Sequence, residues 1–308
     1  MRIRIGTRGS ALALAQSEYV AARLRARGHE CELITVSTIG DRVADREFTD
    51  VGSFGVFVRE LETALLEGHI DAAVHSYKDV PSRMPEGLTL AAVPERVDAA
   101  DVLLVRREVL AAPLGGLPLA PGATVGTSAT RRRALLLNAR PDLVPALLRG
   151  NVPTRVRALT DGKYDAIVLA AAGLARLARG DGPDRLTLGR EIVTLRLDPA
   201  VFVPAPSQGA IAVQVTEKNT AIRDAVARID DPKCRRAVLA ERAALYLADG
   251  GCTLPFGAWC DVAVNERLSL HLALGLADGT VLRALVTGTD PEILAQDGWN
   301  AVTRGAPA

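Results

Sequence analysis

The sequence has few of the residues that metal sites, disulfide frameworks and base-stacking surfaces require. Its 308 residues include only four cysteines and four histidines, and aromatic residues make up 4% of the chain. Neither the cysteines nor the histidines show the paired spacing of a zinc site or a disulfide framework, so no metal is expected. Because the net charge is +1 and no aromatic platform lies beside the arginines, nucleic acid is not an expected partner either.

Long apolar runs and lysines are also scarce. No apolar run reaches the length of a membrane-spanning helix, and the N-terminus is expected to begin a strand and not a signal peptide. We therefore expect a cytoplasmic protein with no membrane partner, long enough for two or three domains. Of the 37 basic residues 33 are arginine, so the positions of the arginines are more informative than their number.

Strand and helix patterns alternate along the first two thirds of the chain, which predicts an α/β fold with two lobes around a cleft. Strands are expected at 2–7, 32–37, 70–74, 101–106, 124–127, 144–148, 166–170, 192–197 and 210–215, and helices at 10–27, 54–67, 129–139, 152–160 and 172–179. From residue 218 a smaller α+β domain is expected, with a helix at 234–248 and strands at 262–264, 268–274 and 281–287. The predicted domains are 1–97 with 197–216, 98–196, and 217–308.

Arginine lies at or just after four predicted strand-to-helix junctions. Such junctions offer free backbone amides and the positive end of a helix dipole, and added guanidinium groups favour carboxylate or phosphate ligands. Any one cluster is equally well explained as a solvated, capped helix face, but four at corresponding strand ends predict a site for a polyanion. The residues concerned are Arg8, Ser10, Thr127, Ser128, Arg131, Arg132, Arg149, Gly150, Arg155 and Arg176.

A further segment, from His75 to Pro81, follows the predicted strand 70–74 and should point into the same cleft. It places Lys78 beside Asp79 in a chain that nearly always uses arginine. An acid and a base at the carboxyl end of a buried strand are well placed for catalysis. The alternative is a surface turn that contains an ion pair.

One cysteine stands apart from the other three. Cys252 follows Gly250 and Gly251, just past the predicted helix 234–248. A thiol beyond a helix C-terminus faces the negative end of the dipole, which disfavours the thiolate form. Cys252 therefore fits an attachment point better than a nucleophile that turns over, and an ordinary loop thiol remains the alternative.

Taken in order, these motifs resemble the porphobilinogen deaminase family, whose members build the linear tetrapyrrole precursor of haem. The resemblance implies two domains of the type II periplasmic-binding-protein kind and a third, smaller domain. It implies a dipyrromethane cofactor, assembled from substrate and attached through a thioether to Cys252. It also implies a transferase that condenses four porphobilinogen units head to tail with loss of ammonia, before hydrolysis releases hydroxymethylbilane. The matching residues include Thr7, Arg8, His75 to Pro81, Leu148 to Asn151, Gln208 to Ala210 and Glu241 to Ala243.

The same resemblance implies roles for individual residues. Asp79 would be catalytic, stabilising the azafulvenium cation and steering the pyrrole N–H groups. A monomer is expected, and a hand-off of product to uroporphyrinogen-III synthase is a further expectation. The cofactor-binding residues would be Ser76, Lys78, Thr127, Ser128, Arg131, Arg132, Arg149, Gly150, Arg155 and Gln208. The substrate-binding residues would be Arg8, Ser10, Arg149, Arg155 and Arg176.

Some positions depart from the family pattern. Asp50 and Phe54 stand where lysines are usual, Ala129 replaces a second serine, and Pro206–Ser207 replaces a glycine-containing pair beside the expected hinge. These departures leave open a second hypothesis, a non-catalytic two-lobed protein that binds a pyrrole or another small polyanion. Asp79 and Cys252 argue against it, because a binding protein needs neither a cation stabiliser nor an attachment thiol.

Overall fold

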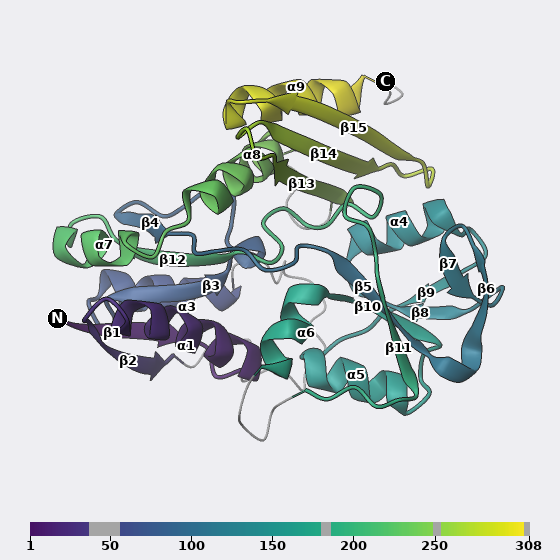
Figure 1. The fold of residues 1–308 in the computed structure, drawn as a ribbon, viewed down its shortest axis with the longest axis horizontal. Helices are drawn as coiled ribbons and strands as arrows, with labels where there is room; N and C mark the ends of the chain where they lie inside the picture. Colours follow the sequence, from purple (N-terminus) through teal and green to yellow (C-terminus); the bar gives the residue numbers. More distant parts are fainter. Residues whose placement is uncertain (37–55, 180–185, 249–253, 305–308) are drawn as a thin grey trace. The chain divides into compact units, whose positions relative to one another are not determined.

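A computed structural model describes residues 1–36, 56–179, 186–248 and 254–304 (Figure 1). The chain folds into two compact units, Met1–Val97 with Gly209–Arg235, and Asp98–Gln208 with Arg236–Ala308. The predicted domain boundary between residues 216 and 217 lies inside the first unit, and residues 197–208 group with the second. The division into three domains stays a prediction.

The first unit is built on a five-stranded sheet in the order β2-β1-β3-β12-β4. The strand β1 runs parallel to β2 and β3, whereas β12 runs antiparallel to β3 and β4. The predicted strand at 210–215 therefore does return to the first sheet. The strands are β1 (Arg2–Thr7), β2 (Glu30–Thr35), β3 (Ala72–Ser76), β4 (Leu88–Ala92) and β12 (Ile211–Thr216).

Two separate apolar clusters cover the faces of this sheet, because successive strand residues point to opposite sides. Helices α1 (Ala11–Arg25) and α7 (Thr220–Ala227) pack with Val74 on one face. Helix α3 (Val56–Leu66) packs with Ala73 on the other. The end of β3 is thus held from both sides.

The second unit contains a sheet in the order β11-β5-β10-β8-β9, in which β8 runs parallel to β9 and β10, and β5 runs antiparallel to β10 and β11. Its strands are β5 (Asp101–Arg106), β8 (Thr124–Gly126), β9 (Val144–Ala146), β10 (Ala166–Ala170) and β11 (Ile192–Arg196). Helix α4 (Thr130–Ala139) covers one face, and α5 (Val152–Thr160) and α6 (Ala171–Ala178) cover the other. A hairpin of β6 (Leu110–Leu114) and β7 (Leu117–Leu119) extends the unit.

The C-terminal part of the second unit is an antiparallel sheet of β13 (Phe256–Val262), β14 (Leu268–Gly275) and β15 (Val281–Gly288). Residues of α8 (Pro232–Ala248) and α9 (Pro291–Thr303) form an apolar core with one face of this sheet (Figure 1). From the other face, Trp259 and Ala273 join the core beneath α4. The prediction of an α/β fold with a smaller α+β C-terminal part is confirmed.

Candidate functional site

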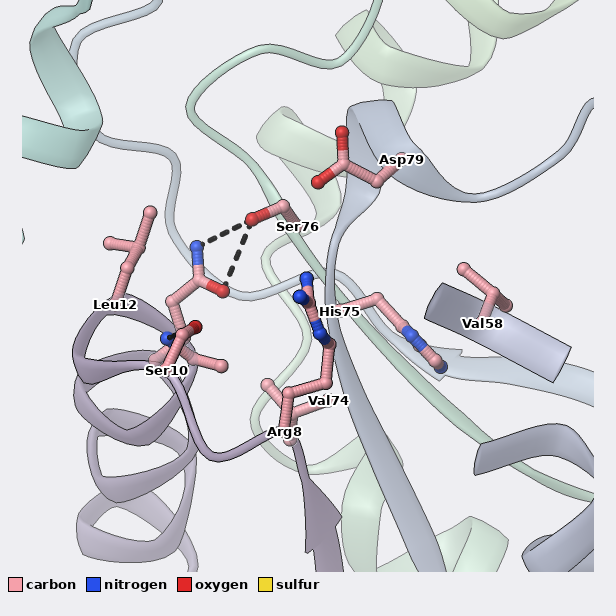
Figure 2. Close-up of a pocket in the computed structure, with 10 residues that line it drawn as sticks. Arg8, Ser10, Leu12, Val58, Val74, His75, Ser76 and Asp79 are labelled. Atoms are coloured by element: carbon pink, nitrogen blue, oxygen red, sulfur yellow. Dashed lines mark hydrogen bonds between the residues drawn. The ribbon is translucent and has the colours of Figure 1, made fainter. Parts of the chain in front are cut away.

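A pocket of about 90 Å³ lies in the first unit, where β1 and β3 end and α1 begins (Figure 2). It contains four of the predicted site residues, Arg8, Ser10, Ser76 and Asp79. The structure therefore brings together side chains from positions 8 to 79 of the sequence. The rest of the lining consists of Leu12, Ala13, Gln16, Val58, Val74 and His75.

The local structure explains why these residues meet. The strands β1 and β3 are parallel, with Gly6 opposite Ala73, so the residues that follow them lie at the same edge of the sheet. Ser10 caps α1, and its Oγ accepts a hydrogen bond of 3.3 Å from the amide of Ala13. This cap turns the chain sharply after β1 and leaves Arg8 beside the end of β3.

Ser76 is held by a residue that the sequence analysis did not single out. Its Oγ lies 2.8 Å from Nε2 and 3.1 Å from Oε1 of Gln16 (Figure 2). Gln16 is only 3% exposed although it is polar, and it lies on the face of α1 that also buries Val20 and Leu24. A glutamine on an otherwise apolar helical stripe was the signal that could have identified it.

Asp79 ends a short 3-10 helix, Tyr77–Asp79, that follows β3 directly. The amide of Tyr77 donates to the carbonyl of Ala210 at 3.0 Å, which ties this helix to the chain just before β12. Asp79 is exposed, and its carboxylate points toward the side where Ser76 and Arg8 lie (Figure 2). Lys78 is half-buried and is not among the residues that line this pocket.

Below the pocket, a buried polar chain links the end of β3 to α3. His75 Nε2 lies 3.1 Å from Gln214 Oε1, and Gln214 Nε2 donates to Glu62 Oε1 at 3.0 Å. Burial lowers the pKa of His75 to about 4, so the imidazole is neutral at neutral pH. Burial also raises the pKa of Glu62. A neutral imidazole that donates from Nε2 lets every link of the chain pair a donor with an acceptor.

In the second unit, three of the predicted cofactor-binding residues converge on one carboxylate. Arg131 Nη2 donates to Asp101 Oδ2 at 2.8 Å, and Arg132 donates to Asp101 Oδ1 from Nη2 at 2.7 Å and from Nε at 3.1 Å. Gln208 Nε2 donates to the same Oδ1 at 2.9 Å. Asp101 was absent from the sequence prediction. An acidic residue at the start of the buried strand β5 was its only signal.

This cluster is almost completely removed from water. Asp101 is 0% exposed, and Arg131 and Arg132 are 5% and 6% exposed. Burial alone would raise the pKa of Asp101, but the charges of the two guanidinium groups hold it well below its usual range. The carboxylate is therefore ionised, and the cluster carries two positive charges against one negative charge.

The other predicted residues of this unit lie at the same edge of its sheet, because β8, β9 and β10 are parallel. Thr127 follows β8 and is buried, and its Oγ1 accepts a hydrogen bond of 3.2 Å from the amide of Ala129. Ser128, Arg149 and Gly150 are exposed, and Arg176 is half-buried on α6.

Asn151 caps α5, since its Oδ1 accepts a hydrogen bond of 2.9 Å from the amide of Thr154. Gly150, before this cap, has a φ of +97°, and a Cβ there would lie 2.9 Å from the Thr154 side chain. Arg155 Nε donates to the carbonyl of Gly150 at 2.7 Å. The turn therefore depends on glycine and fixes Arg155 beside it.

Three residues of the prediction, Cys252, Asp50 and Phe54, lie outside the described residues. Within the part of the chain that the structure describes, no helix is both long enough and apolar enough to span a membrane.

Comparison with known proteins covers nearly the whole chain. Residues 3–224 match the family described as "Porphobilinogen deaminase, dipyromethane cofactor binding domain", and residues 235–299 match "Porphobilinogen deaminase, C-terminal domain". The chain is 42% identical over 302 residues to the porphobilinogen deaminase of Lachnospira eligens, covering 96% of this chain and 97% of that protein. It is 43% identical over 281 residues to that of Geobacter sulfurreducens, covering 91% and 83%. Among solved structures, the periplasmic VFT2 domain of Bordetella pertussis BvgS is 16% identical with a TM-score of 0.39, over 74% of this chain and 86% of that one.

Proposed function

The chain belongs to the porphobilinogen deaminase family, and on that premise we propose that it is an active porphobilinogen deaminase of the transferase class. It condenses four porphobilinogen units head to tail, with loss of ammonia, on an enzyme-bound dipyrromethane primer, and then releases hydroxymethylbilane by hydrolysis. The observation that carries the proposal is the pocket in which Arg8, Ser10, Ser76 and Asp79 meet, in a chain that matches both family domains.

The donors of the second unit suit a ligand that carries several carboxylates. The Asp101 cluster has an excess of one positive charge, and Thr127, Ser128, Arg149 and Arg155 follow the neighbouring strand ends. Guanidinium and hydroxyl groups are the donors that acetate and propionate side chains require. We propose that Arg131, Arg132, Thr127, Ser128, Arg149 and Arg155, with Ser76, Lys78 and Gly150, hold the dipyrromethane. Gln208 contributes through Asp101, to which its side chain donates. When bound, the dipyrromethane supplies the primer that is extended.

Asp79 is proposed to act on the substrate as ammonia leaves. Positive charge then develops on the reacting pyrrole, and a fixed carboxylate opposite that charge stabilises it. Asp79 is exposed at the pocket and so can approach a ligand directly. Arg8 and Ser10, at the β1 end of the same pocket, are proposed to bind the substrate carboxylates together with Arg149, Arg155 and Arg176. Arg8 and Ser10 orient the ring toward Asp79.

The attachment point is proposed to be Cys252. A thioether forms once, so a thiol that lacks the help of a helix dipole is sufficient for it. A monomer, a cytoplasmic location and delivery of product to uroporphyrinogen-III synthase complete the proposal.

Intact-protein mass spectrometry tests this function directly. The purified wild type should weigh more than its sequence by one dipyrromethane, and Cys252→Ser should lack the addition and the activity. A Cys31→Ser variant is the matched control, because it removes a half-buried thiol of the first unit and should keep the addition. Incubation with porphobilinogen, followed by acid and detection of uroporphyrin, measures turnover. A wild type that stays unmodified and inactive when made in cells with an intact pathway would instead favour a binding protein.

A further inference from the structure

The Asp101 cluster uses its arginines differently from an ordinary ion pair. Arg132 directs Nε and Nη2 to Asp101 and donates from Nη1 to the carbonyl of Val168 at 2.9 Å. Arg131 divides its contacts between Asp101 and the carbonyl of Val203, to which Nη1 donates at 2.7 Å. Each guanidinium plane is thus fixed at two points, one on a carboxylate and one on the backbone. Such a side chain has little freedom left to rotate.

Among the residues that the structure describes, the ion pairs of this cluster do not balance in charge. Two guanidinium groups surround one carboxylate, and all three side chains are more than nine-tenths buried. A buried charge without a counter-charge is costly. A second anion beside Arg131 and Arg132 would remove that cost, and a carboxylate of the bound ligand is the anion that the proposed function supplies.

The Asp101 carboxylate also contributes to the contacts between the two ends of the segment 98–208 of the second unit. Gln208 Nε2 lies 2.9 Å from Asp101 Oδ1, 2.8 Å from the carbonyl oxygen of Ala99 and 3.3 Å from that of Ala100, so its two hydrogens are shared among three acceptors. Residue 98 begins the second unit and residue 208 ends its first segment. One amide therefore fastens both ends of this segment to each other, and Asp101 fixes that amide.

We propose that Asp101 is a positioning residue that holds Arg131, Arg132 and Gln208 in the arrangement that receives a ligand carboxylate. In this assignment Gln208 is a clamp between the two ends of the segment and acts on the ligand only through Asp101 and the arginines. The inference rests on the proposed function for the identity of the anion, but the geometry that it explains belongs to the protein alone.

A second arginine–aspartate pair of this unit differs from the Asp101 cluster, because its arginine is buried but its aspartate is exposed. Arg140 is 1% exposed and donates to Asp142 from Nε at 2.8 Å and from Nη2 at 2.6 Å. It also donates to the carbonyls of Leu117 and Leu119, which belong to the hairpin strand β7. One positive charge meets one negative charge there, so Asp142→Asn is a control in the same unit that removes the exposed carboxylate partner of a buried arginine.

The experiment compares Asp101→Asn with Asp142→Asn in the full chain. The first measurement is the fraction of folded protein that carries the cofactor mass, and the second is KM for porphobilinogen in the modified fraction. We expect Asp101→Asn to lower the modified fraction or raise KM at least tenfold, and Asp142→Asn to change both less than twofold. Should Asp101→Asn match Asp142→Asn in both quantities while both lose stability, Asp101 is structural only.

Nitrogen-15 NMR of the arginine Nε–H groups gives a readout that does not depend on catalysis. In the wild type the Arg132 Nε–H should exchange slowly with solvent, and Asp101→Asn should accelerate that exchange at least tenfold. Equal exchange rates would overturn the proposal. If the wild type carries no cofactor at all, the proposed function fails, yet this measurement still decides whether Asp101 holds the arginine. If Asp101→Asn does not fold, Arg132→Lys keeps the charge, loses the double contact and should lower the modified fraction similarly.

Discussion

Two aspartates, one in each unit, occupy opposite environments. Asp79 is exposed, at the end of a short helix that borders a pocket. Asp101 is completely buried, and its two oxygens accept hydrogen bonds from two arginines and a glutamine. Asp79 follows the end of β3, and Asp101 begins the antiparallel strand β5 opposite Ala170, at the end of β10. Each aspartate therefore lies at the edge of its sheet where parallel strands end.

The difference shows how one type of side chain serves two purposes. A carboxylate that must meet a transient cation has to remain open to the ligand. A carboxylate that arranges other residues has to be closed off, since in a low-dielectric environment its contacts are stronger and better oriented. Exposure therefore separates the proposed catalytic group from the proposed positioning group more clearly than sequence motif does.

The largest expected effect is on turnover, from Asp79→Asn. The variant keeps the shape of the side chain but removes the charge that opposes the developing cation, so kcat should fall by roughly a factor of 10³. Because Asp79 is exposed, the free energy of unfolding should change by less than about 0.5 kcal/mol. Steady-state kinetics and urea unfolding check the two quantities. Turnover within tenfold of the wild type would remove Asp79 from the mechanism.

In the same two assays, Asp101→Asn should change the free energy of unfolding more than it changes kcat. Removal of one partner from a buried charge cluster lowers the free energy of unfolding by about 3–5 kcal/mol. If Asp79→Asn destabilises the protein as strongly as Asp101→Asn, the two aspartates are not distinguished by burial and the comparison fails.

Acid stability sharpens the comparison, because the first unit has its own buried polar group in His75. The pKa of His75 is about 4 in the folded protein and about 6.5 in an unfolded chain, so only the unfolded chain binds a proton between these values. The contribution of His75 to the free energy of unfolding is therefore fully present above pH 6.5. It falls by about 3 kcal/mol as the pH drops to 4. Glu62, whose pKa is raised, acts in the opposite direction, since its neutral form is favoured by folding.

The His75→Gln variant isolates this contribution. It leaves Glu62 in place, so the difference between wild type and variant reports the histidine alone. Urea unfolding at several pH values should give a wild-type curve that is steeper by about 1.4 kcal/mol per pH unit between pH 6 and 4.5. Parallel curves would mean that His75 takes up its proton while the protein is folded.

Much of the fold could be predicted from periodicity. The strands Arg2–Thr7, Asp101–Arg106 and Ala166–Ala170 and the helix Val152–Thr160 have the predicted bounds, because their apolar patterns are regular and their caps are local. The prediction of strand 262–264 was wrong in extent, since β13 begins at Phe256. Gly257 in this strand allows the backbone of Val203 to come close, because a Cβ at Gly257 would lie 2.7 Å from the carbonyl oxygen of Val203.

Helix α9 was missed for a similar reason. Its start is well marked, since Asp290 accepts hydrogen bonds from the amides of Glu292 and Ile293 and Pro291 follows directly. Gly298 weakens the helical pattern, yet a Cβ at Gly298 would lie 2.8 Å from Leu272, so the glycine allows close packing on β14. Helix propensity, which depends on local sequence, cannot reveal that Gly298 is required for packing against β14.

The residues of the candidate site likewise fall into those that the sequence predicted and those that it did not. The motifs predicted which residues gather at strand ends, because strand ends and caps are local features. They did not reveal Asp101 or Gln16, whose importance depends on partners 30 or 60 residues away. The roles of the predicted residues stay predictions until the variants described above are measured.

The smallest expected effect concerns Ser207, next to the glutamine that Asp101 holds. Ser207 has a φ of +64°, is completely buried, and its Oγ has no hydrogen-bond partner among the described residues. Left-handed backbone and a buried unpaired hydroxyl each destabilise the folded state, whereas glycine gains freedom in the unfolded chain. Ser207→Gly should therefore raise the free energy of unfolding by about 1 kcal/mol.

The matched control for that prediction is Ser17→Gly. Ser17 is equally buried and its Oγ likewise has no partner within the described chain, but it lies inside the regular helix α1. Glycine in a helix interior costs about 1 kcal/mol, so this variant should be less stable than the wild type. Opposite signs in urea unfolding would show that backbone conformation decides the outcome. If both variants lose stability, the segment beside Gln208 stores no strain, and the amide of Ser207, which donates to Glu241 at 2.6 Å, holds an unstrained turn.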